Sequence, residues 1–347
     1  MTVESGTASA SHAKKARKAR LRRLKIRRLR SIRLESEFNP CSESQSTTST
    51  SYVEDISASG GERKLESLAS GLRYGYISVL GRRRTMEDAI TVAPRWMAGT
   101  DYAFFAVYDG HGGSTVAEKC SKKLHKYLEK HIEMEKKLPQ GKEFDWKKVM
   151  GECFRSMDNE VLEEGGRGGG GETAEWRKVG STAVVVLVGK EGLVVANCGD
   201  SRAVLSRGGV AVPLSCDHKP DRQDEKGRIE AAGGRILNWN GWRVEGILAT
   251  SRSLGNYCLR PFVIFEPEVN VQKRIGSDDF LIIATDGLWE VVYNEVACQV
   301  VRKCLRRNRS QYSHRGGSTT EAATILAELA IAKGSRDNIS IIVVQLK

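Results

Sequence analysis

The chain has 347 residues, of which 40% are hydrophobic, so it can bury the core of one large domain or two small ones. No apolar stretch approaches the roughly 20 residues that span a bilayer, and the small, polar residues at the start do not form a signal peptide. Eight cysteines lie far apart with no C-x-x-C pair, which argues against a zinc site and favours reduced core thiols of an intracellular protein.

The formal net charge of +12 comes from one segment. Residues 11–33 contain 12 Lys and Arg and no acidic residue, so the remaining 324 residues are formally neutral. Nucleic-acid binding is therefore not expected, because the rest of the chain is neutral and aromatic residues do not alternate with the basic run. The basic run suits nuclear import, an acidic partner or simple solvation. The basic run also contains the apolar residues Leu21, Leu24, Leu29 and Ile32, so a helix that lies on a membrane surface is a further alternative.

A Ser/Thr-rich stretch, residues 42–51, follows the basic run and contains few apolar residues. Such a composition cannot bury enough surface to fold alone. We therefore predict that residues 1–70 form a disordered tail, that residues 71–347 form the folded domain, and that the protein is found in the nucleus and cytoplasm.

Beyond the tail, the chain contains apolar runs typical of buried strands and segments with helical periodicity. The predicted strands are Tyr74–Leu80, Tyr102–Tyr108, Ser181–Val188, Leu193–Asn197, Ala203–Ser206, Phe280–Ala284 and Ile339–Leu346. The predicted helices are Ser114–Lys136, Asp145–Leu162, Asp221–Ala232, Asn294–Arg307 and Thr319–Lys333. Because the strands come in consecutive groups with short turns, antiparallel pairing is favoured over alternating βαβ units. We predict an α+β fold with two packed antiparallel sheets flanked by helix pairs.

Acidic motifs stand where predicted strands end. Asp109 directly follows the run that ends at Tyr108, and Asp286 follows the run that ends at Ala284. The motifs Met86-Glu87-Asp88 and Arg336-Asp337-Asn338 add further carboxylates. Carboxylates that converge on one place repel one another unless cations lie between them, and oxygen ligands suit Mg²⁺ or Mn²⁺. The pattern therefore predicts a site that binds two such ions and hydrolyses a phosphate ester.

Seven motifs occur in a characteristic order: Gly81–Asp88, Val107–Gly113, Val179–Ala183, Asn197–Arg202, Asp217–Pro220, Thr285–Trp289 and Asp337–Ser340. Together they resemble the metal-dependent Ser/Thr phosphatases of type two C. The resemblance covers residues 72–347. It implies hydrolysis of phosphoserine and phosphothreonine by a water activated between two metal ions, without a covalent intermediate.

The resemblance also implies a ligand set for two ions: Asp109, which would bridge them, the Gly110 carbonyl, Asp286, Asp337 and Glu87. A glycine suits a backbone ligand, because no side chain crowds the ion. Asp200 and Glu290 would help to hold a weaker third ion.

Two further residues resemble catalytic groups of the family. Arg83, four residues before Glu87, matches the phosphate-binding arginine, whose fork fits two phosphate oxygens. Arg82 and Arg84 flank it, so the register could differ by one residue. His111 matches a proposed general acid for the leaving alkoxide, although a purely orienting hydrogen bond is an equal alternative.

The segment from Asp217 to Val244 is similar to the plant clade A phosphatases, the abscisic-acid co-receptors. In that group a Trp inserts between the gate loops of the hormone-bound receptor, and Trp239 matches its position. An indole suits this role because it offers a large apolar area with few rotatable bonds. The alternative is that Trp239 or Trp242 packs beneath its own loop. The resemblance further implies receptor contacts at Gly112, Gly180 and Ser181, kinase substrates and a monomeric protein.

Three positions depart from the common pattern of the family: Asn256 and Glu290, where Asp is usual, and Glu245, which is often apolar in the clade. The first two bear on the third ion and on the catalytic rate. Glu245 bears on receptor affinity, since a carboxylate at an interface rim changes its electrostatics. A weakened or inactive phosphatase fold that acts as a binding module is therefore the alternative function.

Overall fold

The computed structural model describes residues 72–97, 100–137, 144–166, 173–307 and 319–347. All of them belong to one compact unit, Ser57–Lys347. The predicted tail and the basic run lie outside the described residues.

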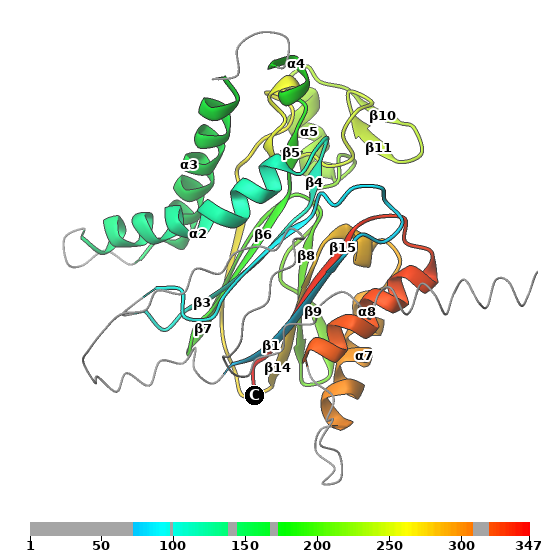
Figure 1. The fold of residues 1–347 in the computed structure, drawn as a ribbon. Helices are drawn as coiled ribbons and strands as arrows, with labels where there is room; N and C mark the ends of the chain where they lie inside the picture. The colour runs from blue at the N-terminus through cyan, green and yellow to red at the C-terminus, as the bar shows by residue number, and fades with distance from the viewer. Residues whose placement is uncertain (1–71, 98–99, 138–143, 167–172, 308–318) are drawn as a thin grey trace, which may run out of the picture. The chain divides into compact units, whose positions relative to one another are not determined.

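Two five-stranded antiparallel sheets form the centre of this unit (Figure 1). The first sheet has the order β1 (Arg73–Val79), β15 (Ile339–Gln345), β14 (Asp278–Ala284), β8 (Arg202–Arg207) and β9 (Val210–Pro213). The second sheet has the order β13 (Glu268–Lys273), β7 (Gly192–Cys198), β6 (Ala183–Val188), β3 (Ala103–Tyr108) and β2 (Ala89–Ala93).

Strand β3 shows why these sequences form buried strands. Its six residues are all buried, and their side chains point alternately to the two faces of the sheet. Phe105 and Val107 belong to the apolar cluster between the sheets, which also contains Ile283 of β14 and Ile342 of β15. Phe104, Ala106 and Tyr108 point to the opposite face of the sheet and belong instead to the apolar cluster between this sheet and its helices. The sheets therefore pack face to face through one apolar layer.

The long helices cover the outer faces of the sheets in pairs (Figure 1). Helices α2 (Thr115–Lys136) and α3 (Trp146–Gly166) lie on the second sheet, and α7 (Asn294–Arg307) and α8 (Thr319–Lys333) lie on the first. The predicted fold is confirmed in both its sheets and its helix pairs. Helix α3 runs four residues beyond the predicted end at Leu162. In the part of the chain that the structure describes, no helix has the length and apolarity needed to cross a membrane.

Short elements gather at one end of the sheets. A small sheet is formed by β4 (Gly110–His111), β5 (Gly180–Ser181) and β12 (Leu254–Gly255). Helix α5 (Gln223–Ala231) packs against the hairpin of β10 (Ile236–Asn238) and β11 (Trp242–Val244) through Ile229, Val244 and Ile236. The remaining short helices are α4 (Thr173–Trp176), α6 (Asp286–Trp289) and the 3₁₀ turn Tyr257–Leu259.

Candidate metal centre

Carboxylates from both sheets meet at one end of the fold. Asp109 follows β3 of the second sheet, while Asp286 begins α6 after β14 of the first sheet. Asp337 precedes β15, which pairs antiparallel with β14, so these two residues lie at the same end. Glu87 precedes β2, whose first residue pairs with the last residue of β3. The strand ends therefore bring the predicted ligands together.

The electrostatics of the buried aspartates show how strongly they interact. Burial, followed by repulsion from Asp286, Asp88, Asp200 and Asp337, raises the pKa of Asp109 well above its usual value. Burial and repulsion from Asp200 and Glu290 do the same to the pKa of Asp286. The Oδ1 atom of Asp286 is buried and has no hydrogen-bond partner among the described residues.

Such a cluster is unfavourable unless cations compensate its charge. Carboxylate oxygens are also the ligands that Mg²⁺ and Mn²⁺ prefer. The residues present therefore fit divalent ions. Within the described ranges, however, no three His, Cys, Asp or Glu side chains are already arranged to hold an ion.

Gly110 is required by the close approach of two backbone segments. A Cβ atom at this position would lie 2.2 Å from the backbone oxygen of Glu87. A side chain would therefore push apart the segments that carry Asp109 and Glu87. Its carbonyl as a metal ligand remains a prediction.

The geometry distinguishes Arg83 from its neighbours. Its guanidinium donates to Asp337 Oδ2 at 2.6 Å and lies 4.0 Å from Glu87. Partial burial opposes its charge, but the hydrogen bond with Asp337 and the negative charges of Asp337, Glu87 and Asp109 together outweigh burial and raise the pKa of Arg83. Arg82 instead donates to the carbonyls of Ile331 and Gly334 at the end of α8. Arg83 is therefore the arginine that reaches the cluster while half of its side chain stays exposed.

We expect Arg83→Ala to raise KM for a phosphopeptide about 10- to 100-fold, because charge-assisted hydrogen bonds contribute about 1.5–3 kcal/mol. The Mn²⁺ dependence should stay nearly unchanged, since Arg83 is not an ion ligand. Steady-state kinetics over a range of Mn²⁺ concentrations check this. Arg84→Ala is the matched control, because Arg84 is exposed. A KM effect in Arg84→Ala and none in Arg83→Ala would show that the register is wrong.

His111 lies beside the cluster in β4. Its Nε2 atom is 2.6 Å from Asn256 Oδ1. Burial lowers the pKa of His111, and the hydrogen bond with Asn256 opposes that effect. The position that departs from the family pattern thus contacts the predicted general acid directly.

Sequence reasoning missed two residues that organise the centre. Asp88 accepts hydrogen bonds from Thr285 and Ser340, at 3.0 and 2.7 Å, and burial raises its pKa to about 7. Asn338 accepts from the Glu87 backbone N–H at 2.8 Å and donates to the carbonyls of Leu80 and Thr85. Both residues belong to acidic motifs of the sequence, and this position was the available signal that they lie near the metal centre. Their partners are far away in the sequence and could not be identified from it.

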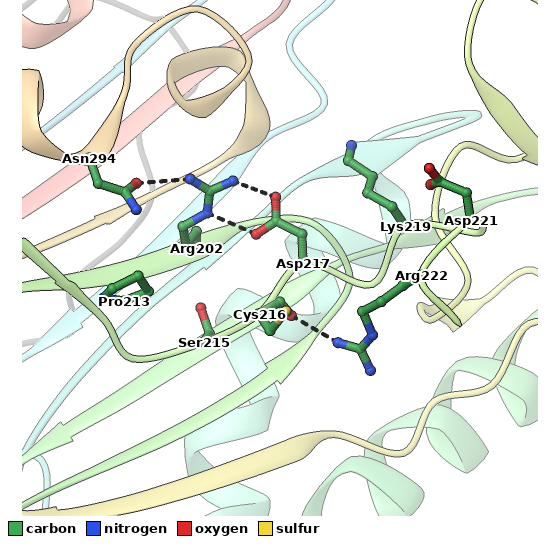
Figure 2. A pocket seen from close by; sticks show the side chains of 9 residues that line it. All are labelled: Arg202, Pro213, Ser215, Cys216, Asp217, Lys219, Asp221, Arg222 and Asn294. Atoms are coloured by element: carbon green, nitrogen blue, oxygen red, sulfur yellow. Dashed lines mark hydrogen bonds and ion pairs between the residues drawn. The ribbon is translucent and has the colours of Figure 1, made fainter. Parts of the chain in front are cut away.

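Asp200 and Glu290, the residues predicted to hold a third ion, both lie close to Lys219. Asp200 is 5% exposed and pairs with Lys219. Burial raises the pKa of Glu290, while Lys219 opposes the shift. Lys219 also lines a cavity of about 460 Å³ in which Arg202 makes a bidentate contact with Asp217 (Figure 2). The cations of this cavity are thus largely neutralised by neighbouring carboxylates.

The hairpin of β10 and β11 presents Trp239 to solvent with 66% of its surface exposed. Trp242 is also 43% exposed, so neither indole is buried beneath the loop. Glu245 accepts hydrogen bonds from the Arg235 backbone N–H at 2.6 Å and from its guanidinium at 2.8 Å. The carboxylate is thus turned into the hairpin and paired. Of the other predicted receptor contacts, Gly112 is exposed, whereas Gly180 and Ser181 are buried.

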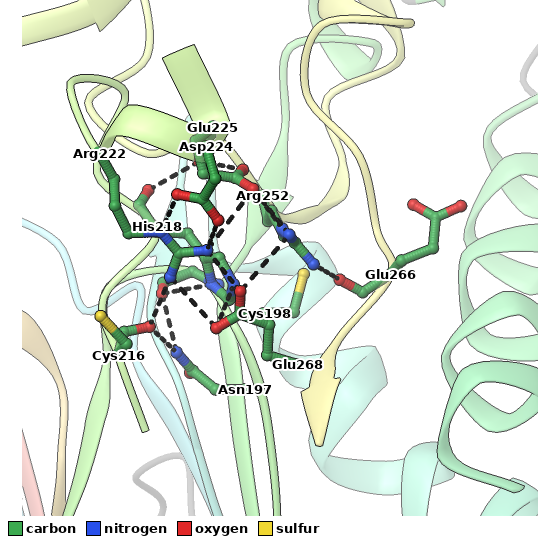
Figure 3. A network of polar contacts seen from close by, with 12 residues as sticks. Asn197, Cys198, Cys216, His218, Arg222, Asp224, Glu225, Arg252, Glu266 and Glu268 are labelled. Carbon is green, nitrogen blue, oxygen red and sulfur yellow. Dashed lines mark hydrogen bonds and ion pairs between the residues drawn. The ribbon is translucent and has the colours of Figure 1, made fainter. Parts of the chain in front are cut away.

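A buried ionic network anchors this hairpin region to the sheets (Figure 3). Glu225 of α5 is 1% exposed and accepts hydrogen bonds from Arg252, Arg228 and Ser251. Burial opposes the charge of Glu225, but these donors outweigh burial and lower its pKa. His218 is fully buried, and its Nδ1 atom lies 3.0 Å from both the backbone nitrogen and the carbonyl oxygen of Gly199.

The fold and the acidic cluster together define a metal-dependent phosphatase. The chain matches the family described as Protein phosphatase 2C over residues 72–339. It is 51% identical over 306 residues to "Probable protein phosphatase 2C 8" of Oryza sativa subsp. japonica, covering 79% of this chain and 74% of that protein. It is 41% identical over 343 residues to "Protein phosphatase 2C 3" of Arabidopsis thaliana, covering 86% and 76% respectively.

A crystal structure of serine-threonine phosphatase 2C from Toxoplasma gondii has the same fold, with a TM-score of 0.67 and 24% identity. The match covers 80% of this chain and 95% of that one. The chain therefore belongs to the protein phosphatase 2C family and is a metal-dependent protein serine/threonine phosphatase, which confirms the predicted enzyme class.

Proposed function

We propose that this phosphatase dephosphorylates regulatory kinases and is inhibited by hormone-bound abscisic-acid receptors. It would then act as a negative regulator of abscisic-acid signalling. The observation that carries this proposal is the exposed indole of Trp239, which is close in sequence to two further exposed apolar side chains, Trp242 and Ile247. Grouped exposed apolar side chains are typical of an interaction site, whereas single ones are common on any protein surface. The test is inhibition of the purified protein by a receptor with and without the hormone.

The acidic cluster supports a defined division of roles in the reaction. Asp109, the Gly110 carbonyl, Asp286, Asp337 and Glu87 would hold two Mg²⁺ or Mn²⁺ ions, with Asp200 and Glu290 beside a weaker third. When bound, these ions would neutralise phosphate charge and lower the pKa of a water.

Arg83 would orient the phosphate, because its guanidinium can exchange the bond with Asp337 for two phosphate oxygens. This role fits a side chain that lies at the edge of the cluster and is half exposed.

The hairpin geometry supports a rigid docking element. Trp239 precedes a tight turn in which Asn240 and Gly241 have positive φ angles of 55° and 117°. The Arg235–Glu245 pair closes the hairpin, and the Glu225 network anchors α5 behind it. An indole on a pre-organised hairpin loses little conformational entropy on binding. The pairing of Glu245 also compensates the charge that its sequence position would bring to a receptor interface.

A binding module with weakened catalysis is the second candidate, and Asn256 in place of the usual Asp is the observation that favours it. Phosphate release from a phosphothreonine peptide in the presence of Mn²⁺ separates the two candidates. Turnover typical of an enzyme, about 1–10³ s⁻¹, would exclude the module.

We further propose that the protein is a monomer in the nucleus and cytoplasm, with residues 11–33 as the import signal. Deleting residues 1–35 should leave kcat/KM unchanged and move a fluorescent fusion from the nucleus toward the cytoplasm, because the basic run is the predicted import segment. Live-cell imaging beside a kinetic assay of the same variant checks both parts. Unchanged nuclear accumulation would contradict the role of this segment.

A further inference from the structure

The cavity of about 460 Å³ beside Lys219 adjoins the metal centre. Lys219 lines the cavity and donates to Asp200 Oδ2. Asp200 in turn lies close to the predicted ion ligands, since burial and then nearby charges, that of Asp200 among them, raise the pKa of Asp109 and of Asp286. An extended peptide spans about 3.3–3.6 Å per residue. The residues that flank a phosphoresidue held at the centre can therefore reach this cavity.

The three cations that line this cavity already have carboxylate partners. Arg202 donates to both oxygens of Asp217, at 2.9 and 2.7 Å. Arg222 donates in the same bidentate way to Asp224, at 2.8 and 2.7 Å. The third cation is Lys219, whose partner is given above. Bidentate pairs between Arg and a carboxylate are among the stronger hydrogen-bonded contacts. An acidic side chain of a substrate would therefore have to displace a carboxylate that is already in place.

Asp221 differs from the other charged residues of the cavity. It lines the same cavity and is exposed, and Figure 2 shows its carboxylate without a hydrogen bond or ion pair to the other lining residues. Its carboxylate does not cap α5 either, because the residue at the N-cap position is Arg222. The charge without a partner in this cavity is thus negative. An incoming cation can pair with Asp221 without breaking an existing ion pair.

We propose that Asp221 determines substrate specificity by binding a basic side chain, Arg or Lys, that lies within a few residues of the phosphoserine or phosphothreonine of the substrate. The preferred substrates are then phosphopeptides with a basic residue near the phosphorylated one. Pro213 and Cys216 give the cavity apolar surface against which the methylene stem of a basic side chain can pack. This inference rests on the proposed phosphatase function, to which it adds the class of substrate, and is independent of hormone regulation.

The test uses phosphothreonine peptides with alanine at the flanking positions. A single arginine is placed in turn at each position up to about four residues before and after the phosphothreonine, which covers roughly 13 Å on either side. We expect arginine at one or two neighbouring positions to lower KM about two- to fivefold relative to alanine, the size of an exposed ion pair. Glutamate at the same position should raise KM. The gain from arginine should shrink in about 0.5 M NaCl, because salt screens exposed charges.

Variants of the cavity assign the preference to one residue. The measured quantity is the ratio of KM for the alanine peptide to KM for the arginine peptide, so that each variant has its own reference. Asp221→Asn should bring this ratio to about one, and Asp221→Lys should make the glutamate peptide the better substrate. Glu230→Gln is the matched control, because Glu230 is an exposed carboxylate of α5 that does not line the cavity. Its ratio should equal that of the parent. Circular dichroism melting confirms that each variant is folded.

Three results would overturn the proposal: no gain from arginine at any position in the parent, a gain that persists in Asp221→Asn, or an equal loss of the gain in Glu230→Gln. The last result would indicate a general effect of surface charge. If the parent hydrolysed none of the peptides, the enzymatic part of the proposed function would fail instead. Fluorescence anisotropy of the same peptides, labelled and bound to the parent and to Asp221→Asn, would then decide whether Asp221 selects a basic residue.

Discussion

Asp109→Ala and Asp286→Ala should each abolish phosphopeptide hydrolysis, with kcat/KM falling about a thousandfold or more. Loss of a ligand removes ion contributions of several kcal/mol to the transition state, and 1.4 kcal/mol corresponds to one decade. In the absence of metal ions, both variants should be no less stable to unfolding than the parent, because each substitution removes a buried carboxylate that its neighbours repel. Added Mn²⁺ should raise the melting temperature of the parent more than that of either variant.

Asp101→Ala is the matched control for these variants, since Asp101 is an exposed carboxylate just before the other end of β3. Its activity and its Mn²⁺-induced thermal shift should equal those of the parent. Substantial Mn²⁺-dependent turnover in Asp109→Ala or Asp286→Ala would contradict the metal-centre assignment.

Trp239→Ala should keep full phosphatase activity and escape inhibition by a hormone-loaded abscisic-acid receptor. Removing a central aromatic anchor commonly costs about 2–4 kcal/mol, which is roughly a 30- to 1000-fold loss of affinity. Activity should be retained because Trp239 stands on an exposed hairpin outside the acidic cluster. Inhibition titrations with receptor and hormone, using a phosphopeptide substrate, measure the effect.

Trp242→Ala is the control for loss of an exposed indole on the same hairpin. Its side chain is 43% exposed and lies on β11, so we expect its inhibition curve to stay close to that of the parent. Full inhibition of Trp239→Ala, or failure of every receptor to inhibit the parent, would refute the co-receptor proposal. The phosphatase assignment would stand in either case.

Long elements could be predicted from the sequence because their burial leaves a regular pattern. The predicted bounds of α7 and α8 match the structure, and the β3 run differs by one residue. Strands β2 and β13 were not predicted, because their half-buried residues do not form a fully apolar run. The two-residue strands β4, β5 and β12 are too short to have a period at all.

In the candidate site, too, only the features that have a local sequence pattern could be predicted. Asp109 and Asp286 could be identified because each follows a buried strand, which local sequence reveals. The orientation of His111 could not, because its partner Asn256 is 145 residues away. Asn256 drew attention only as a departure from the family pattern. Its contacts with Lys178 and Ser253 depend on how three short strands meet, and no local pattern encodes that meeting.

The hydrogen bonds of Asp88 have a consequence for how the two sheets stay aligned. Apolar contacts between sheets have no preferred direction, so they permit small sliding movements. Asp88 directly precedes β2 of one sheet. In the other sheet, Thr285 directly follows β14 and Ser340 belongs to β15. This directional link lies at the end where Asp109 of one sheet must face Asp286 of the other. The spacing of the ion ligands therefore depends on a residue that need not touch an ion.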